Sequence, residues 1–170
     1  MPTFQPPQSL IDFFNLGMFR YVPKFQHKVN VETVINIGAG IKHIDGAMSL
    51  DLPEWDADTM AIPFGDDMVD IIYALHFLEH VKEPIKLLRE CERVLRPGGI
   101  INVVVPYYSS QIAHVDLDHK HYFTERTFDN LFKNDYYEKN HQNWRLAVGL
   151  QLIMGLEERN ICLFAQITKD

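Results

Sequence analysis

The sequence has little cysteine, no long apolar run and no excess of positive charge, and each shortage excludes a class of protein. Its 170 residues include two cysteines, Cys91 and Cys162, which fit small core side chains better than a disulfide framework or a zinc site. No apolar run approaches the roughly 20 residues that a membrane-spanning helix needs. The formal net charge of -7 disfavours nucleic acid as the main partner, because phosphate backbones are bound by clustered Lys and Arg.

The N-terminal end lacks a basic start followed by an apolar stretch, so no secretory signal is indicated and we expect a cytoplasmic protein without membrane association. The length suits one domain over 1–170, with an arm and helix over 1–30, a core over 31–135 and a terminal hairpin over 136–170. Aromatic residues at helical spacing predict a helix over 9–21. That helix fits packing on the sheet edge, a lid over a substrate pocket, or a homodimer contact.

Hydrophobic patterns predict strands that alternate with helices. Apolar segments at 33–37, 47–52, 69–75 and 100–105 predict strands, and the last is typical of a parallel strand buried on both faces. Apolar residues at helical spacing predict helices over 84–95, ended by Pro97-Gly98-Gly99, and from Thr124 to Phe132. Two apolar stretches, 144–154 and 160–168, predict a β-hairpin. The expected fold is α/β, a Rossmann-like doubly wound, mostly parallel sheet with a C-terminal antiparallel hairpin.

Several segments, in a fixed order and spacing, carry a resemblance to a known family. They are Ile35-Asn36-Ile37-Gly38-Ala39-Gly40, Asp51, Asp58-Thr59-Met60-Ala61-Ile62-Pro63-Phe64, Phe64-Gly65-Asp66-Asp67-Met68-Val69-Asp70, Leu78-Glu79-His80-Val81 and Arg93-Val94-Leu95-Arg96-Pro97-Gly98-Gly99. Together they resemble the class I S-adenosylmethionine-dependent methyltransferases, and among them the small type 11 group. The resemblance implies a cofactor-binding core over 31–135, S-adenosylmethionine as cofactor, and methyl transfer as the activity.

The resemblance also assigns the cofactor site, and elementary chemistry agrees with it. Glycines let the backbone turn sharply and approach a ligand, and ligands of such sheets lie beyond the carboxyl ends of the strands. A carboxylate at a strand end suits ribose hydroxyls, although Asp51 also fits a solvated loop, Asp58 a turn cap and His76 a cap of the next turn. Asp58 is expected to accept from the adenine amino group, Thr59 to offer a backbone donor, and Leu75 and His76 to lie against the sulfonium end. The expected cofactor-binding residues are Gly38, Ala39, Gly40, Asp51, Leu52, Asp58, Thr59, Leu75 and His76.

One departure from the family concerns the link between the first two strands. Only residues 38–46 separate them, although a parallel crossover normally needs about a dozen residues. We expect a tight loop with one helical turn at most, so the helix N-terminus that would face the cofactor carboxylate is shortened or missing. A subgroup with the pattern Gly46-Ala47-Met48-Ser49-Leu50-Asp51 shares this short link. It leaves open a methyltransferase-like module that binds S-adenosyl compounds without turnover. A nucleotide-sugar or NAD-type enzyme is disfavoured, because a pyrophosphate requires the missing third glycine and helix.

Candidates for acid–base chemistry gather after the strand at 100–105. Methyl transfer needs the acceptor held close and aligned, and an oxygen acceptor also needs a base. The segment 118–124 resembles a motif of the same subgroup, so His119 is our first choice for a base or acceptor-orienting group and His114 the second. His80 is less favoured, because residues 78–80 are expected to open a helix. The acidic charge and the His, Tyr and Asp residues favour a small-molecule or saccharide acceptor.

A metal site is the alternative reading of this histidine-rich segment. His and carboxylate side chains suit several divalent ions. However, the cluster has no distant partner in the sequence and no His-Glu-x-x-His pair, and such residues in loops usually form turns. We therefore expect no metal. The residues weighed are His114, Asp116, Asp118, His119 and His121.

Overall fold

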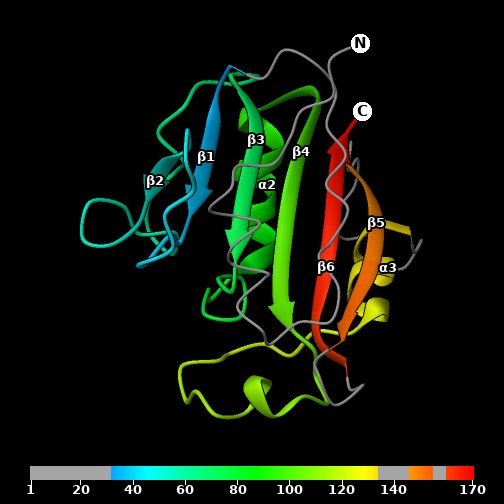
Figure 1. The fold of residues 1–170 in the computed structure, drawn as a ribbon. Helices are drawn as coiled ribbons and strands as arrows, with labels where there is room; N and C mark the ends of the chain where they lie inside the picture. Colours follow the sequence, from blue (N-terminus) through cyan, green and yellow to red (C-terminus); the bar gives the residue numbers. More distant parts are fainter. Residues whose placement is uncertain (1–31, 134–145, 155–159) are drawn as a thin grey trace.

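The computed structural model describes residues 32–133, 146–154 and 160–170, and their core is a single six-stranded sheet (Figure 1). The helix expected over 9–21 and the arm over 1–30 lie outside the described residues. The strands are β1 (Val34–Ile37), β2 (Met48–Leu50), β3 (Val69–Leu75), β4 (Leu95–Pro106), β5 (Leu146–Met154) and β6 (Asn160–Lys169). The helices are α2 (Pro84–Val94), a short 3-10 turn η1 (Gln111–Ala113) and α3 (Glu125–Lys133). Within the described residues no helix is both long and apolar enough to cross a membrane.

The sheet has the order β2-β1-β3-β4-β6-β5, which confirms the expected mostly parallel sheet with a C-terminal hairpin. β2, β1, β3 and β4 run parallel, with Asn36 opposite both Ser49 and Tyr73. β6 inserts between β4 and β5 and is antiparallel to both. The order in which strands are added to the sheet switches between β1 and β3, because β2 lies on one side of β1 and β3 on the other. This switch point is where open α/β sheets bind their ligands.

The helix α2 covers one face of the sheet because its apolar residues share one side. Leu87, Leu88, Cys91 and Val94 are buried in the same core as the inward side chains of the strands, and Figure 1 shows α2 alongside β3 and β4. Pro84 begins the helix where its missing N–H costs nothing. Cys91 and Cys162 are both free and buried, so both are core residues as expected. A second, smaller apolar cluster around Tyr73 and Phe164 forms on strand residues of the other face.

Two predicted boundaries are wrong. β4 begins at Leu95, directly after α2, and not at Ile100, because Asp67 and Met68 donate backbone hydrogen bonds to the carbonyls of Arg93 and Val94 at 3.0 and 2.8 Å. These bonds draw Leu95 opposite Val69, and the residues up to Ile100 form a bulge. β2 is also shorter than 47–52, because the carbonyl of Asp51 accepts from Trp55 and closes a turn.

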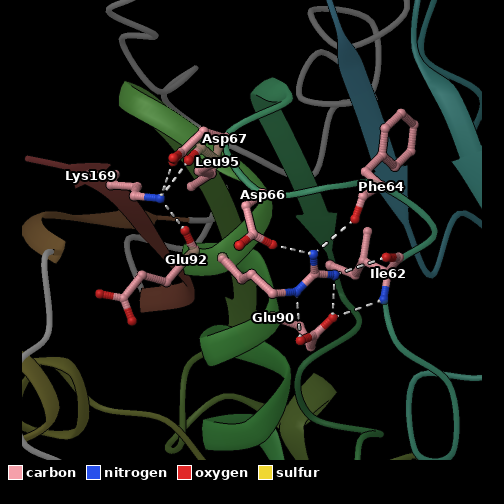
Figure 2. Close-up of polar contacts among 9 residues, drawn as sticks. Ile62, Phe64, Asp66, Asp67, Glu90, Glu92, Leu95 and Lys169 are labelled. Carbon is pink, nitrogen blue, oxygen red and sulfur yellow. Dashed lines mark hydrogen bonds and ion pairs between the residues drawn. The ribbon is translucent and has the colours of Figure 1, made fainter.

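An arginine of α2 holds the link that precedes β3. Arg93 donates to the Phe64 carbonyl at 2.9 Å and to the Ile62 carbonyl at 3.1 Å, and both oxygens of Glu90 accept from it at 2.8 and 2.9 Å. Asp66 accepts at 2.9 Å, and Figure 2 shows how these groups converge. Such a planar donor set satisfies two loop carbonyls and two carboxylates at once, so the link is fixed on the helix.

The short link between β1 and β2 is confirmed. Residues 38–47 contain turns and no helix, closed by hydrogen bonds from Lys42 to the Ala39 carbonyl at 2.7 Å and from Ala47 to the Ile44 carbonyl at 3.0 Å. The side-chain amide of Asn36 donates to the Lys42 carbonyl at 2.7 Å and braces the loop from within the sheet. The expected start of α3 is also right, since the Thr124 hydroxyl accepts from the backbone N–H of Thr127 at 3.3 Å.

Candidate functional site

The carboxyl ends of β1, β2 and β3 border two adjoining hollows. The larger has a volume of about 520 Å³ and the smaller about 260 Å³, and both are lined by Asp51, Leu52 and Trp55. Binding pockets for small molecules commonly range from about 300 to 1,000 Å³, so the larger hollow alone has the size of a ligand site. The two hollows together form one cleft at the switch point of the sheet.

The loop after β1 and the end of β2 meet at this cleft as expected. Gly38 and Gly40 have φ of 62° and 52°, a left-handed conformation that favours glycine. The Asp51 carboxylate accepts from the backbone N–H of Gly40 through Oδ2 and from that of Leu52 at 2.8 Å through Oδ1. Each carboxylate oxygen keeps a further acceptor site, so Asp51 can still accept from two hydroxyls. Ala39 and Gly40 line the larger hollow beside Asp51.

Asp58 lies in the wall of the smaller hollow, whereas Thr59 takes part in a local hydrogen-bonded turn. Asp58 Oδ1 accepts from the backbone N–H of Lys82 at 2.8 Å, which ties this wall to the start of α2. The backbone N–H of Thr59 donates to the Asp56 carbonyl at 3.2 Å, and its hydroxyl donates to the Asp56 carboxylate at 3.0 Å. The backbone donor that we expected from Thr59 is therefore engaged in this turn.

Leu75 ends β3 and His76 follows it, but neither is among the residues that line the two hollows. His76 has φ of 54°, unusual for a residue other than glycine, and its backbone N–H donates to the Val104 carbonyl at 2.7 Å. Its Nδ1 lies 3.2 Å from Glu79 Oε1 and its Nε2 lies 3.6 Å from Cys162 Sγ. The imidazole therefore faces Glu79 and the start of β6.

The two histidines predicted for catalysis have different surroundings. His114 is exposed, stacks on Tyr122 with ring centroids 4.9 Å apart, and places Nε2 2.7 Å from the Tyr108 carbonyl. His119 places Nδ1 2.9 Å from the Ala113 carbonyl, which requires Nδ1 to carry the proton and leaves the lone pair on Nε2. The His119 ring stands edge-on to His80, with centroids 4.7 Å apart. His80 lines the smaller hollow, so His119 approaches the cleft through it.

Sequence reasoning missed three residues of this region. Phe77 lies against Gly38, where a Cβ added to the glycine would overlap the phenyl ring. Trp55 is buried at 3% exposure and lines both hollows. Lys42 reaches from the loop after β1 to the Leu75 carbonyl, with Nζ 2.9 Å from that oxygen, and burial lowers its pKa while Glu79, Cys162 and Asp51 raise it. For Phe77, the one available signal was its position, as a large apolar residue directly after His76 at the end of β3.

The fold is an α/β fold of the class I methyltransferase type. A SAM-dependent methyltransferase from Archaeoglobus fulgidus superposes with a TM-score of 0.60 at 15% identity, covering 83% of this chain and 87% of that one. A SAM-dependent methyltransferase from Methanosarcina mazei superposes with a TM-score of 0.57 at 16% identity, covering 85% and 94%. At these identities the likeness establishes the fold.

The family resemblance inferred from the motifs is confirmed for the middle of the chain. Residues 42–103 match the family described as "Methyltransferase domain". A methyltransferase of Mycobacterium leprae, described as uncharacterized, is 47% identical over 45 residues, which are 26% of this chain and 17% of that protein. The segment that this chain shares with the mycobacterial relatives thus spans about a fifth or less of the length of those proteins. The matched segment contains Asp51, Asp58, Leu75 and His76, and ends within β4.

Proposed function

We propose that this chain binds S-adenosylmethionine in the cleft and transfers its methyl group to a small-molecule or saccharide acceptor in the cytoplasm. The observation that carries the proposal is the position of Asp51, at the end of β2, beside the left-handed loop at Gly38 and Gly40 and shared by both hollows. It combines the carboxylate that a ribose requires with a backbone that a ligand can approach closely.

The side chains of the cleft suit the parts of this cofactor. Asp51 holds the ribose hydroxyls, and Asp58 accepts from the adenine amino group at the wall of the smaller hollow. Lys42 offers a positive charge to the cofactor carboxylate, and so replaces the helix N-terminus that the short loop after β1 does not provide. Phe77 and Trp55 exclude water beside the reacting sulfur, with ring centroids 6.2 Å apart.

Bound in this cleft, S-adenosylmethionine supplies a methyl group on a positively charged sulfur. An oxygen acceptor that took this methyl group would have to give up its proton to a residue of this chain. His119 is the base that we favour, because the Ala113 carbonyl fixes its proton on Nδ1 and leaves Nε2 ready to accept one. His114 is the second choice, because its ring stacks on Tyr122, whereas the His119 ring meets His80, a residue that lines the smaller hollow.

Calorimetric titration with S-adenosylhomocysteine beside NAD tests the proposal. We expect binding of S-adenosylhomocysteine and none of NAD. Asp51→Asn should weaken that binding about 10-fold, because hydrogen bonds to a charged group contribute about 1.5 kcal/mol or more. Glu54→Gln removes an exposed carboxylate from the larger hollow and serves as the matched control. Equal binding of NAD, or no binding of either compound, would overturn the proposal.

The short loop also favours a second candidate, a binding module without turnover. Residues 38–47 contain no helix, and Phe77 occupies the space next to Gly38. A labelled methyl donor incubated with a panel of hydroxyl and amine acceptors separates the two candidates. Transfer to an acceptor supports the enzyme, and tight binding with no transfer to any acceptor supports the module.

A further inference from the structure

Three side chains that lie apart in the sequence converge at the edge of the cleft. One atom that could bind a metal ion, a carboxylate oxygen or a ring nitrogen, from each of Glu79, His80 and His119 lies within 4.8 Å of the others. Glu79 and His80 follow β3, while His119 belongs to the loop after β4, which is tied down by a hydrogen bond from Lys120 to the Glu79 carbonyl at 2.7 Å. This supplies the distant partners that the histidine-rich loop lacks when the sequence is considered alone.

Glu79 is an unusual component of a protein core. It is 1% exposed, and the structure pairs only one of its carboxylate oxygens, Oε1, with His76 Nδ1. The other oxygen, Oε2, is buried and has no hydrogen-bond partner within the described part of the chain. A buried carboxylate oxygen without a partner costs free energy, so a bound cation would supply the interaction that Oε2 lacks.

The surroundings also hold these groups as ligands are held in metal sites. A metal-binding histidine typically donates its second ring N–H to a backbone carbonyl, and a metal-binding carboxylate is itself hydrogen-bonded. His119 Nδ1 lies 2.9 Å from the Ala113 carbonyl, and Glu79 Oε1 lies 3.2 Å from His76 Nδ1. His119 is thereby left with Nε2 as its ligand atom, so when an ion is bound the base must be His114, our second choice, and not His119.

We propose that Glu79, His80 and His119 form a site for one divalent cation of the zinc class. Two imidazoles and one carboxylate are the ligand set of ions of intermediate softness, whereas magnesium and calcium prefer oxygen ligands alone. Bonds to such an ion measure about 2.0–2.2 Å, which places its ligand atoms about 3.4 Å apart, so atoms that lie within 4.8 Å of one another need to close by at most about 1.4 Å.

Asp116 adds negative charge beside this triad. It is exposed, and its carbonyl accepts from the backbone N–H of His119 at 3.4 Å, so its negative charge belongs to the same loop as that ligand. Because His80 also lines the smaller hollow, an ion bound here stands at the cleft wall, where it can hold an oxygen atom of the acceptor. That role rests on the proposed function, but the ion site does not.

Calorimetric titration of tag-free protein with zinc chloride, after removal of metals with EDTA, tests the site. We expect one ion per chain. Glu79→Gln, His80→Ala and His119→Ala should each weaken its binding about 10-fold or more, as loss of groups in metal sites typically does. His43→Ala removes an exposed imidazole from the loop after β1 and should leave zinc affinity unchanged. Cobalt titration, read by visible absorption, reports the ligand set independently.

Two results would overturn the site: zinc binding in the wild type no tighter than in the three variants, or an equal loss in His43→Ala. If Glu79→Gln fails to fold, His80→Ala and His119→Ala decide, since both side chains are partly exposed. S-adenosylhomocysteine is titrated separately in the presence of EDTA. Cofactor binding without zinc binding refutes only the ion site, and zinc binding without cofactor binding refutes only the methyltransferase proposal.

Discussion

The phenyl ring of Phe77 lies against Gly38, so that the end of β3 and the loop after β1 are packed without space for a Cβ between them. Both residues border the switch point of the sheet. Gly38 also donates its backbone N–H to the Leu50 carbonyl at 2.8 Å, which joins β1, β2 and β3 at one place. The packing of these two residues therefore sets the shape of the cleft floor.

Gly38→Ala should displace Phe77 and weaken binding of S-adenosylhomocysteine. It also places alanine at a φ of 62°, which costs about 1 kcal/mol of unfolding free energy. Gly46→Ala is the matched control, because Gly46 has φ of 78° and nothing within 4 Å of an added Cβ. Titration and urea unfolding of both variants check this. Equal loss of affinity in the two would show that the Gly38–Phe77 packing does not shape the site.

Lys42→Met should weaken binding of S-adenosylhomocysteine and leave binding of 5'-methylthioadenosine unchanged. The second compound has the nucleoside and the sulfur but no carboxylate, so it does not need the positive charge near the end of β3. We expect about a 10-fold difference between the two losses, the size of one charged hydrogen bond. A parallel loss for both compounds would show that Lys42 acts on the shape of the loop and not on the carboxylate.

The Arg93–Glu90 pair predicts a pH dependence of stability. The hydrogen bonds from Arg93 are the main cause that holds the pKa of Glu90 below its usual value of about 4.3. A carboxyl group with a lowered pKa in the folded state stabilises the fold above about pH 4.3, and this contribution is lost as the pH falls through the lowered pKa. Glu90→Gln should therefore cost about 1 kcal/mol at pH 7 and much less at pH 3.

Urea unfolding of the wild type and Glu90→Gln at several pH values measures that difference. Glu83→Gln is the control, since Glu83 is 67% exposed and its contact with Lys86 Nζ is long, at 3.4 Å. A difference between wild type and Glu90→Gln that stays constant from pH 7 to pH 3 would contradict the assignment.

Lys169 fixes the end of β6 to the end of α2. Its side chain is 4% exposed, and Nζ lies 2.7 Å from Asp67 Oδ1 and 2.6 Å from the carbonyls of both Glu92 and Leu95 (Figure 2). Lys169→Met leaves these carbonyls unpaired at the negative end of the helix, and should cost about 2 kcal/mol in thermal or urea unfolding. Lys86→Met, at a side chain 70% exposed, should cost less than about 0.5 kcal/mol. Equal costs in the two variants would contradict this role.

Local sequence pattern was sufficient for the elements whose structure depends on their own residues. The buried run of β3 and the apolar side of α2 follow directly from residue types and their spacing. The start of β4 did not, because hydrogen bonds from Asp67 and Met68, far away in the chain, decide where α2 ends.

The same distinction holds for the site. The family motifs assigned Gly40 and Asp51 to the same cofactor site, because the parallel order of strands places them at one edge of the sheet. The structure joins the two residues by a hydrogen bond. The approach of His119 to His80 and Glu79 could not be read from the sequence. It depends on a long loop that returns to the end of β3 through the hydrogen bond from Lys120 to the Glu79 carbonyl.

A crystal structure of the protein soaked with S-adenosylhomocysteine tests the central claim most directly. The account predicts electron density for the nucleoside across the ends of β1 and β3, with both ribose hydroxyls within hydrogen-bonding distance of the Asp51 carboxylate. Density at another place, or an empty cleft at millimolar ligand, would contradict it.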